Sequence, residues 1–287
     1  MANKHIGSKM THAEMKYYEL KTSDYTFTYW DNNKNKPVLI LLHGFGATTE
    51  FQWYKQVNEL GEHFRIVMPN LLYFGSSDAT QKGYKISDQV EFISKLTDTL
   101  NIPHFSVCGI SYGALLAAEL ADRYPDKVNK LIITDGPVKF FSDKDLSEIY
   151  KNYQVEHMAD LLLPDNPLEF KKLLNIAYYN PPPVPGFVLK DLYAGFYNYD
   201  KYDQTQLLNH LYDERDNYNS KEYKNPKLPI LLIWGMNDNL IPKHVGEELN
   251  AYFGEKSNLV IINKTAHLPN FEKPGVYTKT IIDFLNK

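Results

Sequence analysis

A serine with a glycine two positions before it and another two positions after it lies between a strand-like run and a helix-like run. The three residues are Gly109, Ser111 and Gly113; the apolar residues 105–108 are typical of a short buried strand, and residues 114–121 of an apolar helix. A sharp turn from strand to helix crowds the backbone two residues to either side, and glycine relieves that crowding. The pattern therefore predicts a nucleophile elbow that exposes the Ser111 hydroxyl above the edge of a sheet.

A hydroxyl nucleophile needs a base to take its proton, and the base needs an acid to orient it. His267 follows the last predicted strand, residues 258–262, and Asp238 follows the preceding strand, residues 230–234. We predict that Ser111 is the nucleophile, His267 the base and Asp238 the acid. Their order along the chain, Ser, Asp and then His, is the order that strand–elbow–helix hydrolases use.

Asp135 is a rival for the role of the acid, because it ends the strand that follows the elbow. A turn residue before Gly136 and Pro137 is a sufficient alternative explanation for it. Among the other histidines, His43 is near the predicted site, but we expect it to form local hydrogen bonds rather than to act as the base. The rest lie in the N-terminal tail, in loops at the wrong edge of the sheet, on a helix, or in the helical segment described below.

Continuous apolar runs alternate with helical patterns along most of the chain. This rhythm predicts an α/β fold with a mostly parallel central sheet and helices on both of its faces. An alternating polar and aromatic segment, residues 16–30, predicts an antiparallel hairpin at the edge of the sheet. The runs predicted as strands are residues 38–42, 64–68, 105–108, 130–134, 230–234 and 258–262, and the predicted helices include 48–60, 87–100, 243–253 and 274–285.

The strand rhythm stops over residues 138–226, where helical segments dominate. We interpret this segment as an inserted helical cap, with residues 15–137 and 227–287 as the core and residues 1–14 as a flexible tail. Ligands of open α/β sheets bind beyond the carboxyl ends of the strands, so the cap would roof that site. Its apolar, tyrosine-rich composition suggests a small to medium apolar substrate, although the sequence does not identify which cap residues bind it.

Composition excludes several classes of protein. The 287 residues are 43% hydrophobic with a net charge of −4 and no basic block, which argues against binding to nucleic acid or to an anionic membrane. No apolar run approaches the roughly 20 residues of a membrane span. The chain has one cysteine and a polar beginning without a secretory signal, so we expect a cytoplasmic protein. No cluster has metal-ligand spacing and no glycine-rich phosphate loop is present, so we predict neither a metal nor a cofactor.

Four motifs in this order resemble the α/β-hydrolase superfamily, in particular its capped, esterase-like serine hydrolases. They are residues 38–46, ending in His-Gly-Phe-Gly, residues 109–113, residues 234–238, and Ala266-His267. The resemblance covers the chain from about residue 36 to its end and implies the same Ser, Asp and His roles. It also implies that the backbone N–H groups of Phe45 and Tyr112 form the oxyanion hole. One loop departs from the family, which often has Asp where this chain has Asn70.

We therefore expect a cofactor-free serine hydrolase acting on carboxylic esters or similar acyl compounds. The same triad and cap serve C–C bond hydrolases of ring-cleavage products, which remain an alternative. A non-catalytic small-ligand receptor on this fold is a second alternative, although such receptors often lose part of the triad. The serine at position 111 argues against the dehalogenase and epoxide-hydrolase branches, which carry a carboxylate at the elbow.

Overall fold

The protein is built on one central sheet, seen in a computed structural model that describes residues 2–197, 201–223 and 228–287. Within these residues the strands are β1 (Lys16–Lys21), β2 (Tyr25–Asp31), β3 (Val38–Leu42), β4 (Arg65–Pro69), β5 (Asp78–Ala79), β6 (Phe105–Ile110), β7 (Val128–Thr134), β8 (Ile230–Gly235) and β9 (Ser257–Ile262). Their spatial order is β1-β2-β4-β3-β6-β7-β8-β9, and β5 pairs with β2. The pairs from β4 across to β9 are parallel, and those of β2 with β1, β4 and β5 are antiparallel. The predicted mostly parallel sheet and edge hairpin are confirmed.

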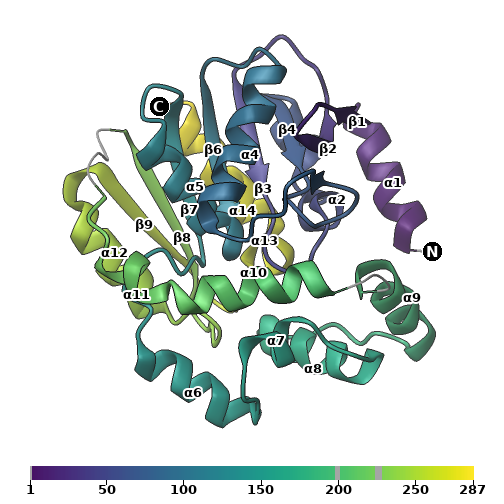
Figure 1. Cartoon of the computed structure of the whole chain (residues 1–287), viewed down its shortest axis with the longest axis vertical. Helices are drawn as coiled ribbons and strands as arrows, with labels where there is room; N and C mark the ends of the chain where they lie inside the picture. Colours follow the sequence, from purple (N-terminus) through teal and green to yellow (C-terminus); the bar gives the residue numbers. More distant parts are fainter. Residues whose placement is uncertain (1, 198–200, 224–227) are drawn as a thin grey trace.

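Helices cover both faces of this sheet, as predicted. Successive strand side chains point to opposite faces, and in β3 Ile40 and Leu42 enter one hydrophobic core while Leu39 and Leu41 enter the other. In Figure 1, α4 and α5 lie in front of the sheet and α14 lies behind it. The helices on the first face are α4 (Ile86–Thr99), α5 (Tyr112–Arg123) and α12 (Lys243–Phe253), and those on the second are α1 (Ala2–His12), α2 (Thr49–Trp53), α3 (Val57–Gly61) and α14 (Pro274–Leu285).

The N-terminal segment differs from its prediction. Residues Ala2–His12 form α1, and the side chains of Ile6 and Met10 are buried in the same core as Trp53. Ile6 and Met10 are four residues apart, which places them on one face of a helix. The prediction of a flexible tail over residues 1–14 is therefore wrong for this segment. The sequence signal was weak because few apolar residues form the buried stripe.

One predicted helix is interrupted and one short helix is new. The predicted helix over residues 48–60 is divided into α2 and α3 by a turn at residues 54–56. A short helix, α13 (Pro269–Glu272), follows directly after His267. It begins with a proline, which is favourable in the first turn of a helix because the proline lacks an N–H group. Helices α2 and α13 both carry side chains that line the cavity described below.

Within the described part of the stretch between β7 and β8, where a helical segment was predicted, the chain forms six helices. Figure 1 shows most of them grouped along one edge of the sheet, at the bottom of the view. They are α6 (Asp143–Tyr153), α7 (Met158–Leu162), α8 (Pro167–Ala177), α9 (Gly186–Tyr197), α10 (Tyr202–Asp213) and α11 (Arg215–Ser220). Part of the predicted 138–226 segment and its junction with the core, residues 198–200 and 224–227, lie outside the described residues. Among the described helices, none has the length and apolarity to cross a bilayer.

The turn between β6 and α5 is a sharp one, centred on Ser111. The Ser111 backbone has φ 55° and ψ −121°, a conformation that L-residues rarely adopt and that costs on the order of 1–3 kcal/mol. A side chain on Gly109 would overlap the carbonyl group of Gly113, and one on Gly113 would lie 2.5 Å from the carbonyl oxygen of His43. The two glycines are therefore required by the close approach of backbone, as the sequence pattern predicts.

Replacing Gly109 by alanine tests this steric requirement. We expect Gly109→Ala to lower the free energy of unfolding by about 3 kcal/mol or more, since the new methyl group meets backbone that cannot move aside. The measurement is urea denaturation followed by circular dichroism. Gly195→Ala is the matched control, because Gly195 lies in α9 with no atom in the way of a methyl group. Equal loss of stability in both variants would contradict this account of the turn.

Candidate active site

Ser111 and His267 line one cavity of about 100 Å³ between the sheet edge and the inserted helices. Ser111 begins the turn into α5, and His267 lies in the loop between β9 and α13. The structure thus brings together two of the three predicted triad residues. The other lining residues are Gly44, Phe45, Gly46, Ala47, Phe51, Gln52, Ile110, Leu162, Phe170, Leu173, Leu174, Ala177, Phe196, Tyr197, Leu240, Leu268 and Phe271.

Asp238 is hydrogen-bonded to His267 in the loops that follow β8 and β9. Its Oδ2 accepts a hydrogen bond from His267 Nδ1 at 2.8 Å, and its Oδ1 accepts from the backbone N–H groups of Leu240 and Ile241 at 2.8 and 3.1 Å. Both side chains are buried. Three hydrogen-bond donors thus converge on the Asp238 carboxyl group and fix its orientation toward His267. With its proton on Nδ1, His267 has Nε2 available as the basic nitrogen.

Asp135, the rival acid, lies at the end of β7 and is not bonded to His267. Its Oδ1 accepts from the backbone N–H of Gly235 at 2.9 Å, whereas its Oδ2 has no hydrogen-bond donor. The side chain is fully buried, and the Asp238 carboxyl group lies within hydrogen-bond reach. Burial, followed by repulsion from the Asp238 charge, raises the pKa of Asp135 well above the usual range. The raised pKa favours the protonated form of the Asp135 carboxyl group.

His43 is hydrogen-bonded at both ring nitrogens in the loop that follows β3 and lines the cavity at Gly44 and Phe45. Its Nδ1 donates to the carbonyl oxygen of Gly44 at 2.8 Å, and its Nε2 accepts from the backbone N–H of Leu71 at 3.0 Å. Complete burial lowers the pKa of His43 to about 4, so the imidazole is neutral at pH 7. Both ring nitrogens are occupied, which agrees with the predicted local role and leaves none to act as a base.

The loop of the predicted oxyanion hole lies against the elbow. A side chain on Gly44 would come within 3.3 Å of the Ser111 Cβ, and both Gly44 and Phe45 line the cavity. Tyr112 is the first residue of α5, where backbone N–H groups have no partner within the helix. The two main-chain groups predicted to bind an oxyanion, those of Phe45 and Tyr112, thus belong to segments on either side of Ser111.

Gln52 is a polar residue of this cavity that the sequence did not single out. It lies in α2, is 4% exposed, and its Nε2 has no hydrogen-bond partner. A buried amide without a partner costs free energy unless something binds it. Gln52 can therefore donate a hydrogen bond to a polar atom of a molecule in the cavity. No sequence motif marks it, because its role depends on how α2 packs against the sheet edge.

Asn70 occupies the position at which the chain departs from the pattern of its family. Its Oδ1 accepts from the backbone N–H of Thr49 at 3.1 Å, and its Nδ2 donates to Thr28 Oγ1 at 3.1 Å. An amide supplies both the acceptor and the donor that these neighbours need. The Asn70 side chain is thus hydrogen-bonded within the buried loop and does not line the cavity.

Across residues 2–197, 201–223 and 228–287, no three His, Cys, Asp or Glu side chains are grouped in a way that would hold a metal ion.

Cys108 is buried in β6, and burial raises the pKa of its thiol to about 12. A thiol with this pKa carries little thiolate at neutral pH and is a poor nucleophile.

Comparisons with known proteins agree with this geometry. A family model described as the alpha/beta hydrolase fold matches residues 37–274. Human epoxide hydrolase 4 is 25% identical over 288 residues, covering 94% of this chain and 78% of that protein. A 2-hydroxy-6-oxononadienedioate/2-hydroxy-6-oxononatrienedioate hydrolase of Burkholderia vietnamiensis is 24% identical, with 90% of each protein covered.

Solved structures share the fold over nearly the whole chain. The crystal structure of a membrane phospholipase A, described as a bacterial virulence factor, superposes with a TM-score of 0.84 at 22% sequence identity. The match covers 99% of this chain and 91% of the other. At this level of identity the similarity supports the fold and says nothing further about the substrate.

The lowered pKa of His43 predicts a pH dependence of stability. Below its usual pKa of about 6.5, the unfolded chain takes up a proton that the folded protein refuses until about pH 4. Stability is therefore lost as the pH falls through this window, by about 3 kcal/mol in total. We expect His43→Gln to lose this part of the dependence, because glutamine does not titrate. Urea denaturation of both proteins between pH 7 and pH 4 measures it, and parallel curves would contradict the assignment.

The raised pKa of Asp135 predicts a pH dependence of stability that is opposite in sign to that of His43. Above the usual aspartate pKa of about 4, the unfolded chain releases a proton that the folded protein retains, so stability falls by about 1.4 kcal/mol per pH unit. Asparagine can accept from Gly235 and donate to Asp238 without titrating. We expect Asp135→Asn to become more stable than the wild type as the pH rises from 5 to 7. A difference in unfolding free energy that does not change with pH would show that Asp135 is ionised.

Proposed function

Because the chain belongs to the α/β-hydrolase fold family, we propose that it is a serine hydrolase that cleaves carboxylic esters or similar acyl compounds of small to medium apolar substrates. The observation that carries this proposal is the presence of Ser111 and His267 in one cavity, with His267 bonded to the buried carboxylate of Asp238. The proposed mechanism needs no metal and no cofactor.

In the first half of the reaction, His267 Nε2 takes the proton of the Ser111 hydroxyl while the Ser111 oxygen attacks the carbonyl carbon. Asp238 stabilises the imidazolium that forms. The tetrahedral oxyanion accepts hydrogen bonds from the backbone N–H groups of Phe45 and Tyr112. The imidazolium then gives its proton to the leaving alcohol, and the acyl group stays on Ser111.

In the second half, His267 takes a proton from water, and the hydroxide oxygen attacks the acyl carbon on Ser111. The second tetrahedral oxyanion uses the same two backbone donors. Its collapse returns the proton to Ser111 and releases the carboxylic acid. In both halves the negative charge develops on the same carbonyl oxygen, and His267 is the base.

We further propose that residues 138–226 act as the cap of this site. The inserted helices contribute apolar side chains to the cavity, and these are the substrate-contacting residues that the sequence left unassigned. An apolar lining favours apolar acyl groups because their transfer from water is favourable. The cap residues in the cavity are Leu162, Phe170, Leu173, Leu174, Ala177, Phe196 and Tyr197.

Hydrolysis of a C–C bond is the second candidate, favoured by the similarity to the Burkholderia hydrolase over 90% of both chains. The similarity to an epoxide hydrolase covers the chain equally well, but a serine at the elbow lacks the carboxylate that the family resemblance assigns to that chemistry. We therefore expect no turnover of a simple epoxide such as styrene oxide.

Removing the Ser111 hydroxyl tests the proposal. We expect Ser111→Ala to lower kcat for p-nitrophenyl esters by about 10⁴-fold or more, since the nucleophile and base act as a unit. The measurement is release of p-nitrophenol from esters ranging from acetate to laurate. Ser106→Ala, in β6 and outside the cavity, is the control and retains wild-type rates. Undiminished ester turnover by Ser111→Ala would overturn the mechanism.

A further inference from the structure

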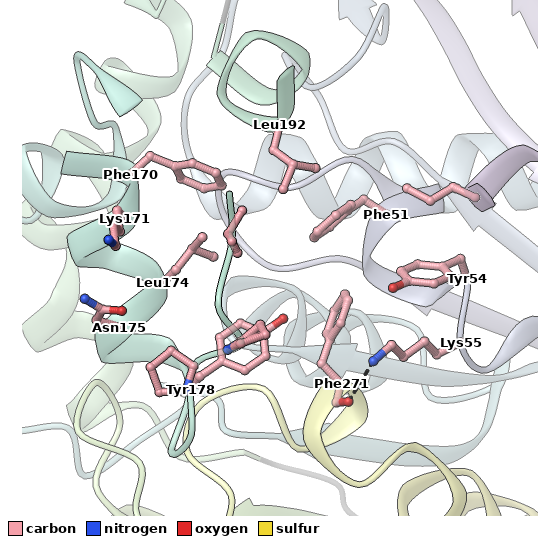
Figure 2. Close-up of a pocket in the computed structure, with 14 residues that line it drawn as sticks. Phe51, Tyr54, Lys55, Phe170, Lys171, Leu174, Asn175, Tyr178, Leu192 and Phe271 are labelled. Atoms are coloured by element: carbon pink, nitrogen blue, oxygen red, sulfur yellow. Dashed lines mark hydrogen bonds between the residues drawn. The ribbon is translucent and has the colours of Figure 1, made fainter. Parts of the chain in front are cut away.

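A second hollow of about 250 Å³ adjoins the cavity that contains Ser111. We call it the outer groove. Figure 2 shows it between α8, which carries Phe170, Lys171, Leu174 and Asn175 and is followed by Tyr178, and the segment with Phe51, Tyr54 and Lys55 on the other side. The remaining lining residues are Ile6, Pro181, Pro182, Val184, Leu192 and Phe271.

The outer groove and the inner cavity share one wall. Phe51, Phe170, Leu174 and Phe271 line both hollows. The ring of Phe51 lies 5.4 Å from that of Phe271, measured between ring centroids. The two hollows are thus adjacent, and a molecule in one can extend into the other where these four side chains move apart.

The inner cavity is too small to hold a typical substrate by itself. Small-molecule sites usually enclose about 300–1,000 Å³, and the inner cavity has about 100 Å³. Together with the 250 Å³ of the outer groove, the space reaches the lower end of that range. An acyl group longer than a few carbons must therefore leave the inner cavity, and the outer groove, which shares four lining residues with it, is an apolar space that adjoins it.

The charges along the outer groove have one sign. Lys55 and Lys171 line it, and no Asp or Glu is among its lining residues. Lys55 Nζ donates to the carbonyl oxygen of Phe271 at 2.9 Å, and partial burial lowers the pKa of its ammonium group. Lys171 is exposed, and its ammonium group forms no hydrogen bond or ion pair with any other described residue. An anionic group at the end of an apolar chain would complement these two cations.

We propose that the outer groove binds the distal part of the substrate's acyl chain, and that Lys171 and Lys55 select chains that end in an anionic group. The substrate class is then an ester of an aliphatic acid with a second, negatively charged end. This inference rests on the proposed serine hydrolase for the position of the ester at Ser111. It goes beyond that function by assigning a second binding site and the charge of its ligand.

The first test compares two p-nitrophenyl esters of equal chain length, the decanoate and the hydrogen sebacate, in which a carboxylate replaces the terminal methyl group. The readout is the ratio of kcat/KM for sebacate to kcat/KM for decanoate. We expect Lys171→Gln to lower this ratio about 3-fold, which corresponds to about 0.7 kcal/mol for the loss of one exposed charge. We expect Lys171→Glu to lower it about 10-fold, which corresponds to about 1.4 kcal/mol, because repulsion replaces attraction. Turnover of the decanoate reports that each variant is folded.

Lys172 provides the matched control, because it is the next residue of α8 and lines a different hollow. Lys172→Gln and Lys172→Glu leave the ratio unchanged if the outer groove is the site. If the sebacate-to-decanoate ratio fell equally in the Lys171 and Lys172 variants, the change would reflect net charge alone and would overturn the proposal. An unchanged ratio in Lys171→Glu would overturn it as well, while Ser111-dependent ester turnover would leave the proposed function intact.

A binding experiment separates the two proposals if no ester is hydrolysed. Dodecanoate and dodecyltrimethylammonium have chains of equal length and opposite charge, and both are titrated by calorimetry into Ser111→Ala below micellar concentrations. We expect dodecanoate to bind more tightly, and its preference to fall in Ser111→Ala/Lys171→Glu but not in Ser111→Ala/Lys172→Glu. Binding without this dependence on Lys171 would exclude the anionic site, whatever the chemistry of Ser111.

Discussion

The backbone turn at Ser111 is the constraint on which the rest of the site depends. Its φ of 55° is unfavourable for a serine, and the surrounding sheet holds it there. The Ser111 N–H donates to the carbonyl oxygen of Thr134 on the neighbouring strand at 2.9 Å, so β7 fixes the start of the turn. Because β3, β6, β8 and β9 run parallel to β7, the loops with His43, Asp238 and His267 emerge at the same edge.

The two buried acids at this edge differ in their partners rather than in their burial. Asp238 receives three hydrogen bonds, whereas Asp135 receives one, and burial together with repulsion from Asp238 raises the pKa of Asp135 well above its usual range. The raised pKa of Asp135 disfavours a second negative charge at this edge of the sheet. Asp238 is the carboxyl group that is hydrogen-bonded to His267, and a mechanism with a transient imidazolium requires such a partner.

Much of the fold could be predicted because buried parallel strands are continuous apolar runs, and α12 and α14 have the predicted bounds, 243–253 and 274–285. Helix α1 was missed because few apolar residues form its buried stripe. The motifs also predicted Phe45 and His267, which line the cavity with Ser111. They could not predict Gln52, the cap residues in the cavity or the outer groove, because these depend on how α2, α8 and α9 pack, and neither helix periodicity nor spacing encodes that packing.

The most direct test of the central claim is to locate the covalent adduct of a fluorophosphonate, which reacts with activated serine hydroxyls. The protein is treated with the reagent, digested, and its peptides are mapped by mass spectrometry. Our account predicts one equivalent of adduct on Ser111, at a rate that falls sharply in His267→Ala. Ester turnover that continues while Ser111 stays unmodified, or an adduct on another residue that abolishes turnover, would contradict it.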